Sequence, residues 1–135
     1  MEKKLLNEWK ERLGLHDWVI TLRYNCKQSD MELEEVAGET HWININKTAN
    51  IRIVSKEVYG DRIIKYDFER ILVHELLHIK FGYLQLENRS YEGMVFDEAQ
   101  HQLIEDLAQS LVMAKRGITN RAKYNIDCAI VKEVK

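Results

Sequence analysis

The chain of 135 residues carries 20 basic and 22 acidic side chains, a formal net charge of −2, and 45% hydrophobic residues. This length can bury one hydrophobic core but not two, so we expect a single domain over residues 1–135. The mixed charges lack the basic stripe typical of nucleic-acid-binding proteins, so we do not expect nucleic acid as a partner.

Cysteine usage and the N-terminal segment bear on location. Cys26 and Cys128 lie far apart in the sequence and belong to no paired motif. Two cysteines are too few for a disulfide-stabilised secreted protein of this size, which favours a reducing cytoplasm. The first ten residues alternate charged and apolar side chains, without the apolar segment of a signal peptide or membrane span. We therefore expect a cytoplasmic protein without a membrane partner, and we favour a monomer.

The first half of the chain contains one predicted helix and several predicted strands. Apolar residues at helical spacing predict a helix over residues 2–13, and Gly14 stands where a C-terminal cap belongs. Residues 27–38 are acidic and predict an irregular connection. Alternating β-branched and aromatic residues predict strands over 18–24, 40–45 and 49–54. The short polar segment between the last two favours an antiparallel hairpin.

The second half contains two predicted helices. A turn is expected at Tyr59-Gly60, and residues 67–81 are apolar on most sides, which predicts a buried central helix ending at Gly82. Residues 84–93 predict a loop. A long helix is expected from about Phe96 to Met113, closed by Gly117, and residues 116–135 form a C-terminal extension.

The predicted central helix carries the motif His-Glu-x-x-His, formed by His74, Glu75 and His78. Positions i and i+4 of a helix lie on the same face, so the two imidazoles can bind one metal ion. Zinc suits two neutral nitrogens and a third protein ligand, and leaves a fourth position open. Glu75 can then act as general base toward a metal-activated water. Two core histidines without a metal would instead bury unmatched polar groups.

The last predicted helix offers three candidates for the third metal ligand, namely Glu98, His101 and Glu105. On a helical wheel, His101 lies inside the apolar arc, Glu105 at its margin and Glu98 further out. The arc consists of Leu107, Leu111, Ile104, Ala108 and Val112. We therefore prefer His101 as the ligand and keep Glu105 and Glu98 as alternatives. Glu105 can also accept the second ring N–H of a ligand histidine.

On these residues the chain resembles the zincin metallopeptidases, and among them the minimal gluzincin-type and SprT-like peptidases of phages and prophages. The resemblance covers about residues 16–115 and is loose outside His74, Glu75 and His78. It implies an α+β fold with a short antiparallel three-stranded sheet packed on an active-site helix and on a second, metal-ligand helix. The gluzincin ligand is a glutamate, often followed four residues later by an acidic bracing residue. Matching the apolar pattern places His101 and Glu105 at these two positions.

The resemblance implies a zinc-dependent metalloendopeptidase that acts on a peptide or protein substrate. It also implies that an extended substrate could pair with the strand edge at 40–45. His41, in the same strand, could line the cleft, although a hydrogen-bonded strand residue is the simpler interpretation. Two alternatives remain: a regulatory or partner-binding protein of phage or prophage origin that keeps the metal site but has little or no protease activity, and a DNA-associated SprT-like protease.

Overall fold

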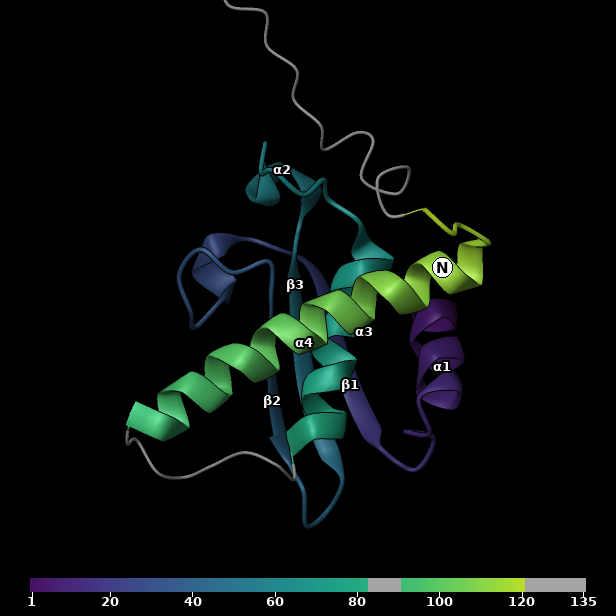
Figure 1. Ribbon diagram of the computed structural model, residues 1–135, viewed down its shortest axis with the longest axis vertical. Helices are drawn as coiled ribbons and strands as arrows, with labels where there is room; N and C mark the ends of the chain where they lie inside the picture. Colours follow the sequence, from purple (N-terminus) through teal and green to yellow (C-terminus); the bar gives the residue numbers. More distant parts are fainter. Residues whose placement is uncertain (83–90, 121–135) are drawn as a thin grey trace, which may run out of the picture.

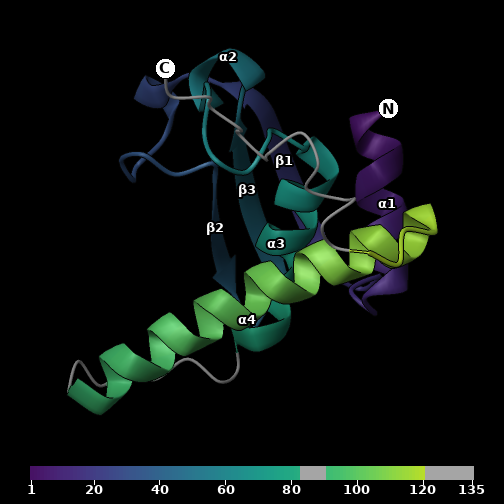
Figure 2. The same ribbon diagram turned by 45° about the horizontal axis from the view of Figure 1, so that its top comes forward.

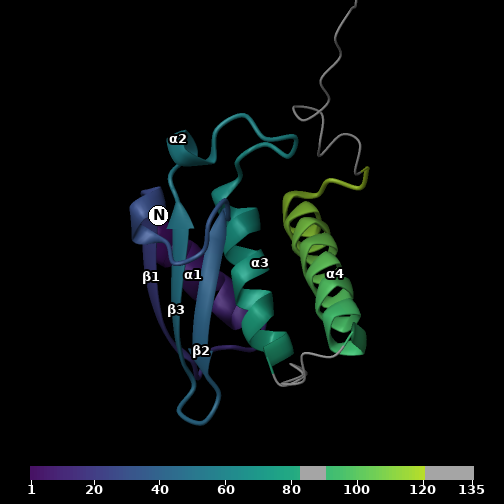
Figure 3. The same ribbon diagram turned by 90° about the vertical axis from the view of Figure 1, so that its left-hand side faces the viewer.

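The computed structural model describes residues 1–82 and 91–120, with the backbone alone for residues 91–96. In chain order, its elements are α1 (Glu2–Arg12), β1 (Val19–Cys26), the 3₁₀ turn η1 (Gln28–Asp30), β2 (Gly38–Ile43), β3 (Thr48–Val54), α2 (Lys56–Tyr59), α3 (Phe68–Phe81) and α4 (Tyr91–Arg116). The predicted α+β class is confirmed. Figure 3 shows the sheet, α3 and α4 as successive layers, so α3 lies between the sheet and α4.

The three-stranded sheet is mixed rather than antiparallel. Its strand order is β1-β3-β2, so β3 is central. β2 and β3 pair antiparallel, from Gly38↔Ile53 to Ile43↔Thr48, which confirms the predicted hairpin. β1 pairs parallel with β3, and the expected fully antiparallel sheet is therefore wrong. Side-chain alternation determines which face of a strand is buried, but it carries no record of strand direction.

The helix boundaries differ from the predicted ones most clearly in α4. This helix starts before the expected Phe96 and includes the last residues of the predicted loop at 84–93, whose remainder lies outside the described residues. It ends at Arg116, one turn after the expected Met113, and Gly117 follows with a φ of +70°, as expected of the closing residue. The C-terminal extension lies mostly outside the described part of the chain, because that part stops at residue 120. Figures 1 and 2 show α4 crossing the outer face of α3 obliquely.

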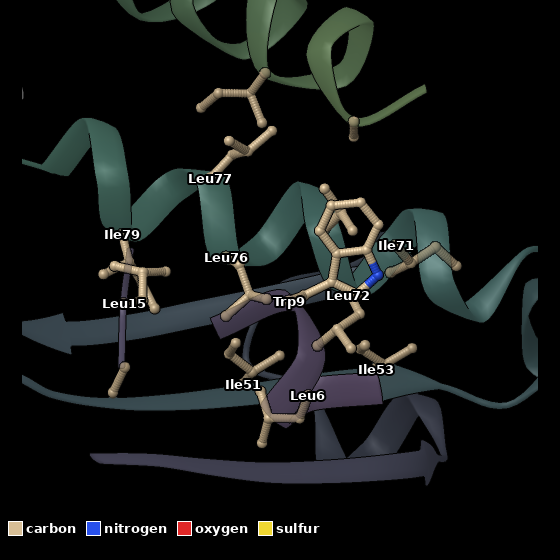
Figure 4. Close-up of a cluster of buried hydrophobic side chains, with 14 of the residues drawn as sticks. Leu6, Trp9, Leu15, Ile51, Ile53, Ile71, Leu72, Leu76, Leu77 and Ile79 are labelled. Atoms are coloured by element: carbon tan, nitrogen blue, oxygen red, sulfur yellow. The ribbon is translucent and has the colours of Figure 1, made fainter. Parts of the chain in front are cut away.

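The hydrophobic core lies on both sides of α3. On the sheet side, Leu72 and Leu76 lie over Ile51 and Ile53, and all four side chains have no exposed surface (Figure 4). On the other side, α4 contributes three fully buried residues at four-residue spacing, which are Ile104, Ala108 and Val112. Burying a large aliphatic side chain stabilises the fold by about 1.5–3 kcal/mol. Packing on two sides therefore fixes the rotation of α3 about its own axis. This rotation determines where the polar residues of the helix point.

Candidate metal centre

The motif residues lie in the middle of α3, whose start is well defined. The Asp67 side chain accepts the backbone N–H of Arg70 at 3.3 Å and caps the helix. His74 and His78 follow one turn apart, and their ring centroids are 5.0 Å apart. Both rings are partly buried. The predicted helical placement of the two histidines is therefore confirmed.

His101 of α4 completes a cluster of three imidazoles, which we call the histidine cluster (His74, His78 and His101). Its ring centroid lies 4.9 Å from that of His74 and 5.6 Å from that of His78. One ligand nitrogen from each residue lies within 4.8 Å of the others. Glu98 is exposed and lies outside this cluster. Of the three candidates on α4, the structure brings two to the pair on α3: His101 lies beside both rings, and Glu105 contacts Nδ1 of His74. His101 is exposed, although the sequence placed it inside the buried arc of the helix.

The chemistry of the cluster fits a metal ion. Zinc–nitrogen bonds measure about 2.0–2.1 Å, so nitrogens on one ion lie roughly 3–4 Å apart, and small side-chain rotations would bring this cluster to that spacing. Burial, reinforced by His74 and His101, lowers the pKa of His78 to about 4. Burial and His74 also lower the pKa of His101. Neutral imidazoles are the form that binds metals, so these two residues need not lose a proton near neutral pH.

Glu105 orients His74. Its Oε2 lies 2.5 Å from Nδ1 of His74, and its Oε1 accepts hydrogen bonds from Arg70 at 2.6 Å and from Gln109 at 3.1 Å. Burial alone would raise the pKa of Glu105, but the hydrogen bond to His74 and the charge of Arg70 outweigh it and hold this pKa at about 2. An ionised carboxylate accepts hydrogen bonds, so Nδ1 of His74 carries the proton and Nε2 is left as the ligand atom.

Glu75 is a buried carboxyl group beside the histidine cluster. The residue is 3% exposed, and its Oε2 has no hydrogen-bond partner within the described residues. Burial raises the pKa of Glu75 to about 7, against the opposing effect of His74. Strand β2 lies close to the Glu75 side chain. A Cβ atom on Gly38 would be only 3.0 Å from Cγ of Glu75. A buried oxygen without a partner is costly and points to an external hydrogen-bonding group.

Two adjoining pockets flank the cluster, and His101 lines both of them. The Trp42 pocket has a volume of about 370 Å³, and its lining includes Leu33, Val36, His41, Trp42, His78 and His101. The Arg62 pocket has a volume of about 260 Å³, and its lining includes Arg62, Arg70, His74, Glu75, His101 and Glu105. The two pockets share Val36, Gly38 and His101 in their linings, and we call the two together the groove.

Several residues around the site were not identified from the sequence. Arg70 supports Glu105, and it precedes His74 by one helical turn, so the spacing used for the histidines could also have identified it. Trp42 packs against the end of α3, where a Cβ atom on Gly82 would overlap the indole ring. Trp42 and Arg62 belong to segments distant from the motif. No local sequence signal placed them beside it.

Comparisons with protein-family models, curated proteins and solved structures gave no match. No helix in the described ranges, 1–82 and 91–120, is both long and apolar enough to cross a membrane.

Proposed function

We propose that this protein is a zinc-dependent metallopeptidase. The observation that carries the proposal is the approach of His101 on α4 to the two histidines on α3, with Glu75 lining the same pocket. Three neutral nitrogen donors and an adjacent carboxylate are the protein groups that a hydrolytic zinc site requires. The resemblance of the motif to zincins agrees with this proposal.

His74, His78 and His101 would hold the ion. A bound zinc ion supplies Lewis acidity, which lowers the pKa of water and polarises a carbonyl group. Glu75 takes a proton from the attacking water and then donates it to the leaving amine. Glu105 keeps His74 in the required tautomer through the contact at Nδ1.

The position of β2 supports a peptide substrate. β2 is an edge strand of the sheet, and its residues line both pockets, with Gly38 at one end and Trp42 at the other. An extended peptide can add to such an edge through main-chain hydrogen bonds, while its side chains enter pockets. A peptide paired with β2 would therefore pass along the groove that contains the histidine cluster.

Metal content and Glu75 test the proposal together. We expect about one zinc ion per chain in the purified protein, and its loss in His74→Ala and His78→Ala, measured by elemental analysis. Glu75→Gln should retain zinc and the fold but lose at least about a hundredfold of the hydrolysis of a broad peptide library, the usual contribution of a general base.

The outcomes separate the proposal from its alternative. Full zinc retention in both histidine variants would exclude the metal centre. Zinc binding without any hydrolysis that depends on Glu75 would instead leave a metal-containing regulatory or partner-binding protein.

A further inference from the structure

Arg62 lies at one end of the groove, where its guanidinium group is fixed by hydrogen bonds but remains accessible to solvent. Its Nε donates to the carbonyl oxygen of Tyr59 at 3.1 Å, and its Nη1 donates to that of Glu35 at 3.4 Å. The guanidinium also stacks over the Tyr59 ring at 4.6 Å. The side chain is nevertheless exposed, and Nη2 has no partner within the described residues. Because the group is already ordered, binding an anion would cost it little conformational entropy.

The other charged groups of the Arg62 pocket leave Arg62 as its available cation. Arg70 is buried and already forms an ion pair with Glu105 at 2.6 Å. Glu35 lines the pocket, and its carboxylate forms no ion pair within the described part of the chain. Glu35, and Glu75 when it is ionised, therefore oppose an anionic ligand in part, while a divalent metal ion at the histidine cluster would favour one.

The position of the Arg62 pocket along β2 indicates which side of the scissile bond would enter it. Of the β2 residues, only Gly38 at the start of the strand lines the Arg62 pocket, whereas the Trp42 pocket is lined by the strand from Gly38 to Trp42. Antiparallel strand pairing is slightly more stable than parallel pairing. A substrate antiparallel to β2 runs from the Trp42 pocket toward Gly38, so its C-terminal side enters the Arg62 pocket. Glu75 and His101 line the same pocket as Arg62, and an extended chain rises about 3.3 Å per residue, so this pocket would receive one of the first few residues beyond the cleaved bond.

We infer that the Arg62 pocket binds a substrate carboxylate on the C-terminal side of the scissile bond, with Arg62 as its hydrogen-bond donor. This inference rests on the proposed peptidase function. A carboxylate suits the fork of guanidinium donors. It can come from an aspartate or glutamate side chain or from the free C-terminus of the substrate, and the second source would make the enzyme act near chain ends.

The test measures binding apart from cleavage. Zinc-loaded Glu75→Gln protein is titrated against fluorescein-labelled, alanine-rich octapeptides that contain one leucine for the apolar wall of the Trp42 pocket. One series places Asp or Asn at each of the three positions after the leucine and ends in an amide. A second series is neutral and ends in either a free carboxylate or an amide. Fluorescence anisotropy gives each dissociation constant.

We expect one carboxylate-bearing series to bind at least about tenfold more tightly than its amide counterpart, the scale of a charge-assisted hydrogen bond. Adding Arg62→Gln should remove this preference while leaving the neutral peptides unchanged, and Arg62→Lys should restore part of it. Glu35→Gln should enlarge the preference. Arg23→Gln is the matched control, because Arg23 is an exposed arginine of β1 outside both pockets.

Equal binding of the acid and amide peptides would overturn the inference, as would Arg62→Gln weakening both kinds equally, since that would show a purely structural role for Arg62. Tighter binding of a lysine peptide than of an aspartate peptide would overturn it in favour of Glu35. These results can be told apart from a failure of the peptidase proposal, which would appear as the absence of zinc-dependent hydrolysis in the parent protein.

Discussion

The two ends of the α3–α4 contact use charged and polar residues in opposite ways. At one end, Arg116 binds Asp67 with two hydrogen bonds of 2.7 and 3.0 Å and Glu69 with one of 3.1 Å. Lys115 bonds to Glu69 and to Glu8. We call these five residues the ion cluster. At the other end, the histidine cluster consists of imidazoles directed toward one another, beside a buried carboxylate oxygen without a partner.

The difference separates groups that hold the helices together from groups that could bind a metal ion. In the ion cluster each acidic side chain meets a basic one, and Trp9 of α1 adds a hydrogen bond to Glu69 at 2.7 Å. In the histidine cluster burial lowers the pKa of His78 and of His101, so a metal ion would supply the missing positive charge. We therefore expect mutations at the two ends to affect different measurements.

The largest effect is expected for the third ligand. His101→Ala should weaken zinc binding by at least about a hundredfold, because it removes one of the three proposed protein ligands. Glu98→Ala is the matched control on the same helix and should leave zinc affinity unchanged, since Glu98 lies outside the cluster. Competition with a chromophoric chelator measures both. Strong zinc binding by the His101 variant, with loss in the Glu98 variant, would reverse the assignment.

A smaller effect on the same measurement is expected for Glu105→Gln. The amide keeps the size of the side chain but removes the charge that faces His74 and Arg70. Loss of a residue that orients a ligand histidine typically weakens metal binding about ten- to a hundredfold. Thermal denaturation of the metal-free variant controls for damage to the fold. Loss of zinc as complete as in His101→Ala would instead indicate that Glu105 is itself a ligand.

Arg116→Gln should affect stability and leave zinc binding unchanged. The change removes the bonds to Asp67 and Glu69, and because Arg116 is partly exposed we expect a loss of about 1–2 kcal/mol in the free energy of unfolding. Urea denaturation of the metal-free protein measures it, with Arg23→Gln as an exposed control. A tenfold change in zinc affinity would show that the two ends are coupled.

The smallest effect is a shift in acid stability. Burial opposes the ionisation of Asp67 and Glu69, but Arg116 for the first, and Lys115 with Trp9 for the second, outweigh burial and lower both pKa values. A carboxyl group with a lowered pKa stabilises the fold above its ordinary pKa, here 3.8 and 4.5, and the contribution disappears as the pH falls through the lowered value.

Unfolding of the metal-free protein, followed by circular dichroism between pH 6 and pH 2.5, should therefore show stability falling below about pH 4.5. In Arg116→Gln the fall should be shallower, because the pKa of Asp67 moves back toward its ordinary value. Identical slopes in the two proteins would show that the ion cluster does not contribute to acid stability.

The sequence by itself determined the relative positions of residues that lie on the same helix. His74 and His78 share a face because they are one turn apart, and Glu75 follows directly on the same helix. The apolar residues of α4 correctly predicted that His101 faces α3, because the periodicity of a helix records which side packs. They did not predict its burial, since His101 is exposed and Glu105 is the more buried of the two. These relations are local, and the hydrophobic pattern encodes them directly.

Tertiary structure alone decided the direction of β1, the closeness of Gly38 to Glu75 and the position of Arg62 at the groove. Each depends on segments far apart in the chain, whose relative placement follows from the packing of the sheet on α3. Hydrophobic periodicity predicts that a side chain is buried, but it does not predict which segment of the chain the side chain packs against. The placement of Gly38 and Arg62 beside the histidine motif therefore came only from the folded protein, whereas His101 and Glu105 were already candidates from the sequence.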